Sequence, residues 1–223
     1  MAEIHGVPGE WARVKGMALG MWPLFAGVFI AGFALAMWLF ASAGFGALLF
    51  ASAGVYCYWS GLKGMRRVER FFKGARGEEK VAGILATLPD GFHVFNDFDA
   101  GSHHVDHVVI GPSGVFSIET KCWSGEVAIE DGTVLINGRL PTREPIPQTV
   151  KEGALVRERL ERLGWKGKVV PVLVFASDNF RYSPIEVGGA VVMNSSSLIP
   201  AIVSGNHVLT EVEVRRLVGI IEN

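Results

Sequence analysis

The feature that most constrains this chain is an uncharged run: no Asp, Glu, Lys or Arg occurs from Gly16 to Leu62. A helix needs about 20 apolar residues to cross the hydrocarbon core of a bilayer, so the run is long enough for two spans. The sequence predicts spans at Met17–Phe40 and Phe45–Leu62, joined by the small residues 41–44. Because this connection is short, the two helices must be antiparallel, and we expect a transmembrane hairpin.

Two other interpretations of the run are weaker. Ala41-Ser42-Ala43 resembles a cleavage site, but the apolar region before it is too long for a signal peptide, and a second apolar run follows it. The run could instead be the core hairpin of a soluble protein, but an uncharged stretch of this length argues against that.

Basic residues flank the run on both sides. Arg13 and Lys15 precede it, and a longer basic set follows it: Lys63, Arg66, Arg67, Arg70, Lys73 and Arg76. Basic flanks of membrane helices stay in the cytoplasm, and two spans return the chain to its starting side. We therefore expect a multi-pass membrane protein with two spans and a cytoplasmic soluble domain. The same basic residues are expected to contact anionic lipid head groups near Lys63–Arg76.

The part of the chain after the hairpin has the composition of an ordinary globular domain. The whole chain carries 21 basic and 22 acidic residues, and two of each precede the run. General nucleic-acid binders usually show a basic surplus, so any contact with DNA must come from a local patch. With only Cys57 and Cys122 present, a disulfide framework is excluded. We expect an N-terminal cytoplasmic segment at 1–15, the hairpin at 16–62, a basic juxtamembrane linker at 63–75 and one domain at 76–223.

Hydrophobic periodicity and turn residues predict a mixed α/β domain after the linker. A juxtamembrane helix is expected to end near Gly74, and a second helix to begin near Gly77. Strands are expected at 92–95, 105–110, 115–120, 126–129, 133–136, 169–175 and 190–193. Further helices are expected at 145–163, 195–203 and 210–221. This order favours a three-layer α/β domain with a mixed β-sheet.

The most informative segment is His103–Lys121, in which a glycine-proline turn joins two alternating strands. A hairpin centred on that turn pairs Asp106 with Glu119 and His104 with Lys121. Because side chains alternate along a strand, Asp106, Glu119 and Lys121 are then expected on one face of the hairpin.

A divalent cation would explain why two carboxylates face each other. Opposed carboxylates destabilise a sheet, and Mg²⁺ or Mn²⁺ takes oxygen ligands such as Asp106 and Glu119. Glu78 could supply a further carboxylate, and Lys121 could orient water, help deprotonate it or stabilise developing charge. Such a cluster suits phosphodiester hydrolysis. The competing interpretation is a solvated surface pair, worth about 0.2–1 kcal/mol.

Around this cluster the chain resembles the nuclease-related domain (NERD) family. The matching motifs are Gly77-Glu78-Glu79, Val105-Asp106-His107-Val108-Val109-Ile110, Gly114-Val115-Phe116-Ser117-Ile118-Glu119-Thr120-Lys121, Ser124-Gly125 and Pro147-Gln148. The resemblance covers about residues 76–163. The family is grouped with the PD-(D/E)XK nuclease-like superfamily, so the resemblance implies a restriction-endonuclease-like fold, a divalent metal and DNA as substrate.

The resemblance also implies roles by position. Asp106 and Glu119 would be metal ligands, Lys121 the catalytic lysine, Glu78 the acid of the preceding helix and Gln148 a polar helix residue beside the site. Members of this family with transmembrane segments also occur, in agreement with the hairpin. A zinc site at His103, His104 and His107 is disfavoured, because alternation divides these side chains between two faces.

The leading hypothesis is a membrane-anchored, Mg²⁺- or Mn²⁺-dependent nuclease that acts on DNA at the cytoplasmic face. The set of Asp106, Glu119 and Lys121 favours it. The alternative is a non-catalytic nuclease-fold module that binds nucleic acid or a protein partner at the membrane, and the neutral overall charge favours this alternative. A weaker possibility is a scaffold for a membrane complex built on the hairpin.

Overall fold

The computed structural model describes residues 1–40, 43–101, 103–177 and 179–222. Half of the expected connection at 41–44 therefore lies outside the described residues. The backbone divides into two compact units. One comprises residues 11–73, and the other combines residues 1–10 with residues 74–223. This division differs from the expected boundaries, because the first ten residues fold with the C-terminal domain.

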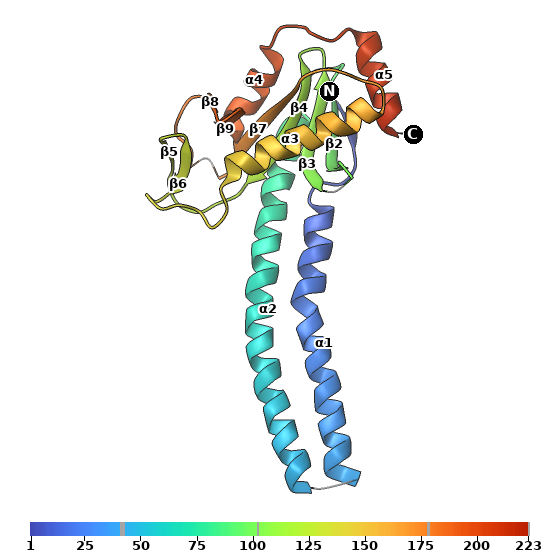
Figure 1. The fold of residues 1–223 in the computed structure, drawn as a ribbon, viewed down its shortest axis with the longest axis vertical. Helices are drawn as coiled ribbons and strands as arrows, with labels where there is room; N and C mark the ends of the chain where they lie inside the picture. The colour runs from blue at the N-terminus through green and yellow to red at the C-terminus, as the bar shows by residue number, and fades with distance from the viewer. Residues whose placement is uncertain (41–42, 102, 178, 223) are drawn as a thin grey trace. The chain divides into compact units, whose positions relative to one another are not determined.

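The first unit is a pair of helices, α1 (Glu10–Phe40) and the first part of α2 (Ala43–Leu85) (Figure 1). Both helices are long and apolar enough to cross a membrane. Glycines let them approach closely, since a Cβ at Gly20 would lie 2.2 Å from Val68 Cγ2 and one at Gly27 2.3 Å from Cys57 Sγ. Close packing of small residues is what holds helices together in lipid.

The helix break expected between Gly74 and Gly77 is wrong. α2 continues through both glycines to Leu85, so the expected linker at 63–75 is helical as well. A glycine inside a helix costs only about 1 kcal/mol relative to alanine. Burial of Val81 and Leu85 in the core of the second unit outweighs that cost.

The second unit is built on a seven-stranded mixed sheet in the order β1-β2-β3-β4-β7-β9-β8, as far as the described residues show. β4 and β7 run parallel and are joined through α3, whereas β2, β3 and β4 form an antiparallel meander. The strands of this sheet are β1 (Glu3–His5), β2 (His93–Asp99), β3 (His104–Gly111), β4 (Gly114–Lys121), β7 (Val169–Phe175), β8 (Ile185–Val187) and β9 (Ala190–Asn194). A separate hairpin consists of β5 (Val127–Glu130) and β6 (Thr133–Ile136).

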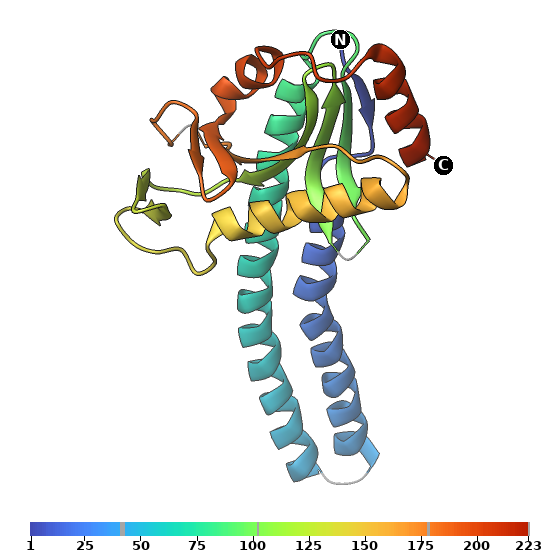
Figure 2. The same cartoon turned by 45° about the horizontal axis from the view of Figure 1, so that its top comes forward.

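Helices cover both faces of the sheet, which makes three layers (Figure 2). One face is covered by the C-terminal end of α2 together with helix α4 (Leu198–Val203). A 3₁₀ turn at Ser195–Ser197 precedes α4. α3 (Pro145–Arg162) and α5 (Glu211–Glu222) pack on the other. Alternation along β4 sends Phe116 to the first face and Val115 to the second. The expected mixed α/β class and its layers are confirmed.

Two strands were not expected from the sequence, β1 and β8. Each has three residues, too few to show an alternating pattern. The expected strand at 92–95 continues to Asp99. Pro171 lies in the central strand β7, although proline is usually found on edge strands. It precedes the part of β7 that pairs with β9, which starts at Val172.

The register of the β3–β4 hairpin is confirmed only near its turn. Pairing runs as predicted from Gly111 opposite Gly114 to His107 opposite Ile118, and the structure gives no pair beyond it. The expected facing of His104 and Lys121 is wrong, because the β3–β4 pairs end at His107 and Ile118. On the other side of β3, His104 lies opposite Asp99 of β2, and its Nδ1 is 3.0 Å from Asp97 Oδ1. The regular β3–β4 ladder therefore ends at His107.

A matched pair of glycine substitutions tests the packing of α2. A Cβ at Gly77 would lie 2.6 Å from the Cβ of Cys122, whereas one at Gly74 would meet nothing within 4 Å. We expect Gly77→Ala to lower the melting temperature of the detergent-solubilised chain. Gly74→Ala should leave it unchanged or raise it, since alanine favours helix by up to about 1 kcal/mol. Equal effects of the two substitutions would contradict this packing.

Candidate active site

The candidate site lies where β4 ends beside β7. The carbonyl of Lys121 accepts a hydrogen bond from the N–H of Ala176 (2.9 Å), which keeps the two strand ends together. Alternation places Glu119 and Lys121 on the same face of β4, the face that α3 covers. In open α/β sheets, the carboxyl ends of neighbouring parallel strands commonly carry the functional groups.

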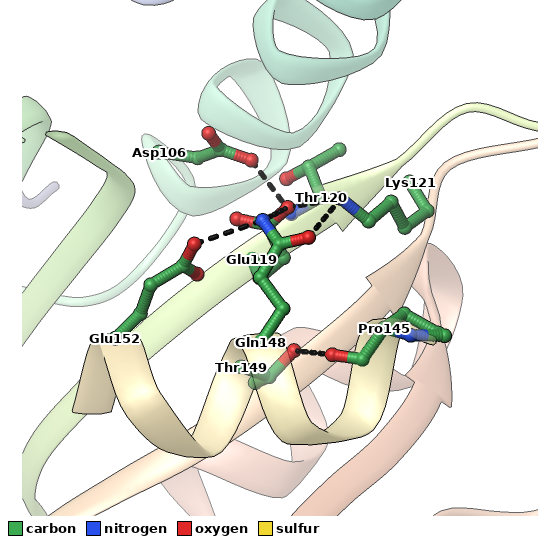
Figure 3. A network of polar contacts seen from close by, with 8 residues as sticks. All are labelled: Asp106, Glu119, Thr120, Lys121, Pro145, Gln148, Thr149 and Glu152. Atoms are coloured by element: carbon green, nitrogen blue, oxygen red, sulfur yellow. Dashed lines mark hydrogen bonds and ion pairs between the residues drawn. The ribbon is translucent and has the colours of Figure 1, made fainter. Parts of the chain in front are cut away.

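A glutamine amide connects the charged groups of β4 to α3 (Figure 3). The Lys121 ammonium donates to Glu119 Oε1 and, at 3.3 Å, to Gln148 Oε1. Gln148 Nε2 in turn donates to Glu119 Oε1 and to Glu152 Oε1, each at 2.9 Å. Because one amide uses both its oxygen and its nitrogen here, it fixes the orientation of all three charged side chains.

The beginning of α3 sets the position of this amide. Pro145 and Pro147 start the helix, where a missing N–H has no cost and a fixed φ suits the first turn. The buried hydroxyl of Thr149 donates to the Pro145 carbonyl (2.9 Å), which ties down the turn that carries Gln148 (Figure 3).

Asp106 reaches the same place from β3. Its Oδ2 accepts a hydrogen bond from the backbone N–H of Thr120 at 2.7 Å. The expected direct pairing of Asp106 with Glu119 is replaced by this side-chain contact, because the ladder ends at His107. The charge of Glu78, on α2, also acts on Asp106. The structure thus brings together the five residues named from the sequence: Glu78, Asp106, Glu119, Lys121 and Gln148.

Glu152 is a member of the site that the sequence analysis missed. It is 5% exposed, and its Oε2 has no hydrogen-bond partner among the described residues. Burial and the neighbouring Glu119 raise the pKa of Glu152 to about 8. Its spacing of four from Gln148 on a predicted helix was the available signal, since positions i and i+4 share a helix face.

Burial and charge shift the pKa values of the other groups as well. Burial raises the pKa of Asp106 well above its ordinary value, and the charges of Glu119 and Glu78 raise it further. Burial alone lowers the pKa of Lys121. The contact with Glu119, helped by Asp106 and Glu152, outweighs burial and leaves the lysine pKa above its ordinary value. At neutral pH the lysine therefore stays charged, and the Glu152 carboxyl retains a proton.

The oxygen donors of this cluster are of the kind that a hard divalent cation takes. Three carboxyl groups, those of Asp106, Glu119 and Glu152, lie in a buried cluster, and Oε2 of Glu152 has no hydrogen-bond partner in the part of the chain that the structure describes. Mg²⁺ and Mn²⁺ prefer carboxylate oxygens and usually retain water. A cation here would replace the protons that burial and mutual repulsion now hold in the cluster.

The histidines of β3 take separate partners. His107 is buried, its Nδ1 lies 2.8 Å from Asn96 Oδ1, and burial lowers the pKa of His107 to about 3. His104 contacts Asp97 instead. His107 and His104 thus face different groups, in agreement with the argument against a shared zinc ion.

Comparison with known families identifies the segment that carries these residues. Residues 73–176 match the model of the nuclease-related domain, NERD. This part of the chain, just under half of it, is similar to a NERD domain. The matched range includes Glu78, Asp106, Glu119, Lys121 and Gln148, and it also includes Glu152. Neither the curated proteins nor the solved structures include a match to the chain.

The raised pKa of Glu152 predicts how stability depends on pH without metal. The folded state holds this proton up to about pH 8, whereas the unfolded chain loses it near the ordinary value of 4.5. Stability must therefore fall as pH rises between these values, by about 1.4 kcal/mol per pH unit for one proton. We expect Glu152→Gln, measured by chemical unfolding of the detergent-solubilised chain in EDTA, to reduce that slope.

Glu158→Gln is the matched control, because Glu158 lies exposed on the same helix and pairs with Arg162. It should retain the wild-type slope. An unchanged slope in Glu152→Gln would show that this carboxyl does not hold the proton.

Proposed function

We propose that this protein is a membrane-anchored, divalent-metal-dependent nuclease whose domain faces the cytoplasm and hydrolyses phosphodiester bonds in DNA. The observation that carries the proposal is the convergence of Asp106, Glu119 and Lys121 on one buried cluster. Perturbed carboxyl pKa values beside a fixed lysine are typical of catalytic sites.

In this proposal Asp106 and Glu119 hold Mg²⁺ or Mn²⁺, with Glu78 and Glu152 adding negative potential around it. When bound, such an ion supplies Lewis-acid stabilisation of the phosphodiester and makes water more acidic. The remaining chemistry belongs to the side chains. Because the pKa of Lys121 is raised, its ammonium group orients water by donating a hydrogen bond and stabilises negative charge, rather than accepting a proton.

Gln148 is a positioning residue in the same mechanism. Its amide oxygen accepts from Lys121, and its amide nitrogen donates to Glu119. These bonds hold the lysine and the carboxylate in fixed rotamers, so little reorganisation is needed when a phosphate arrives.

The proposed membrane anchor is the hairpin of α1 and α2. Both helices pass the length and apolarity required of a span, and large apolar side chains cover their surfaces, with Phe25, Phe29 and Phe40 at least 62% exposed. Arg13 and Lys15 before the hairpin and the basic residues Lys63–Arg76 after it support a cytoplasmic domain. The same residues support contact with anionic lipid head groups.

One observation favours the second candidate, a non-catalytic module that binds nucleic acid or a protein at the membrane. The side chains of Glu119 and Lys121 are only 6% and 18% exposed, and α3 contributes Gln148 directly against them. A cluster this enclosed admits an ion more readily than a DNA backbone. The nuclease proposal therefore requires that DNA reach the cluster at its exposed edge.

The nuclease assay uses the full chain in detergent micelles or nanodiscs, because β1 belongs to the domain and a fragment starting after the hairpin would lose it. Supercoiled DNA, linear DNA and RNA are incubated with Mg²⁺, Mn²⁺ or EDTA. We expect metal-dependent cleavage of DNA that Asp106→Asn and Glu119→Gln each reduce by at least about 100-fold, as loss of a group that stabilises the transition state does.

Glu130→Gln is the control, since Glu130 lies exposed at the end of β5. It should cleave like wild type. Metal binding without cleavage of any of the substrates would instead support the binding module, and equal cleavage by wild type and Glu119→Gln would assign the activity to another protein in the sample.

The membrane proposal has its own test. We expect the chain to stay in isolated membranes after alkaline carbonate extraction, because two apolar spans are not held by charge. A fluorescent protein fused after Asn223 should fluoresce in the bacterial cytoplasm, and alkaline phosphatase at the same place should be inactive. Active phosphatase would show that the C-terminus lies outside the cytoplasm. Release of the chain by carbonate would contradict the two transmembrane spans.

A further inference from the structure

A second cluster of ligating side chains lies on the first two strands of the sheet. β1 runs parallel to β2, and Glu3 lies opposite His93. Alternation places His5 on the same face as Glu3. One ligand atom from each of Glu3, His5 and His93 lies within 4.8 Å of the others. Two imidazoles and a carboxylate thus converge from two strands that are about 90 residues apart in the sequence.

The distances in this cluster match the spacing of ligands around one metal ion. His93 Nδ1 lies 3.3 Å from Glu3 Oε2 and 3.5 Å from His5 Nε2. Around tetrahedral zinc, with bonds of about 2.0–2.1 Å, neighbouring ligand atoms are about 3.3–3.4 Å apart. The two separations from His93 Nδ1 are close to that value.

The other nitrogen of His5 is held in the way that metal-bound histidines are held. His5 Nδ1 lies 3.0 Å from Glu222 Oε1, at the end of α5. A carboxylate at this nitrogen favours the tautomer with the proton on Nδ1, which leaves the lone pair of Nε2 directed at His93. Stacking on Phe95, with ring centroids 4.4 Å apart, fixes the plane of the His5 ring.

We propose that Glu3, His5 and His93 form a Zn²⁺ site, with Glu222 orienting His5 from outside the coordination sphere. Imidazole nitrogens with one carboxylate suit zinc rather than the oxygen-seeking Mg²⁺. A surface cavity of about 590 Å³ is lined by Glu3, His93 and Glu222, so an ion can enter and water can take the fourth position.

The site has a different place and chemistry from the carboxylate cluster. β1 and β2 lie at one edge of the sheet, whereas Glu119 and Lys121 lie on β4, with β3 between. A zinc ion here would join β1 to β2, and through His5 and Glu222 it would also fix the end of α5. Zinc binding should therefore attach the segment that leads into α1 more firmly to the sheet.

The test uses the full chain in detergent, freed of any histidine tag and stripped with EDTA. Zn²⁺ is titrated in competition with a chromophoric chelator, and Co²⁺ is titrated with visible absorption as the readout. We expect one tight Zn²⁺ per chain and the intense absorption of low-coordinate Co²⁺. His5→Gln and His93→Gln should each raise the Kd by more than about 100-fold, and Glu222→Gln by about 10–100-fold.

His207→Gln is the matched control, because His207 is an exposed histidine far along the chain. It should bind Zn²⁺ like wild type. Absorption spectroscopy at the zinc edge of the wild-type complex supplies a readout that needs no variant, and it should show imidazole ligands. No tight binding, binding unaffected by both histidine variants, or binding abolished by Glu119→Gln would overturn the proposal.

Discussion

The candidate site depends on removing carboxyl groups from water at the end of β4. A buried carboxylate without a partner is costly, so the fold must either pair it or let it keep a proton. Both occur here: Glu119 is paired with Lys121, whereas the pKa values of Asp106 and Glu152 rise. Without a metal, the negative charge of the cluster is therefore reduced by Lys121 and by the proton that Glu152 retains at neutral pH.

The same place is where the β3–β4 ladder ends. Beyond His107 the Asp106 carboxylate, rather than a backbone carbonyl, accepts the N–H of Thr120. A regular ladder continued by one more pair would face Asp106 directly against Glu119. Because the ladder ends there, this direct pairing does not form, while the N–H of Thr120 still has an acceptor. The charge of Glu78 on α2 also acts on Asp106.

Much of this arrangement could be predicted from sequence, for reasons that differ between its parts. The uncharged run Gly16–Leu62 predicted two spanning helices, because an apolar stretch of this length is rare in soluble domains and long enough to cross a bilayer twice. Alternation placed Glu119 and Lys121 on one face, and the glycine turn set the register near it. The end of the ladder could not be predicted, since it depends on a side chain replacing a backbone acceptor.

Longer-range packing accounts for the remaining misses. Gly74 and Gly77 suggested a helix end, but contacts with the sheet hold α2 helical through both. Nothing in the sequence distinguishes Glu152 from an exposed acidic residue of an amphipathic helix, because its burial and its bond to Gln148 arise from the packing of α3. β1 could not be predicted, because three residues are too few to show an alternating pattern. The cluster of Glu3, His5 and His93 forms only because β1 pairs with β2.

The central claim is that the cluster around Asp106 and Glu119 binds a divalent cation in exchange for protons. Calorimetric titration of the full chain with Mn²⁺, repeated in buffers of different ionisation enthalpy, measures binding and proton release together. We expect saturable binding of Mn²⁺ with release of protons from the cluster near neutral pH, and we expect Glu119→Gln to lose both. Absence of saturable binding, or binding that Glu119→Gln retains, would contradict it.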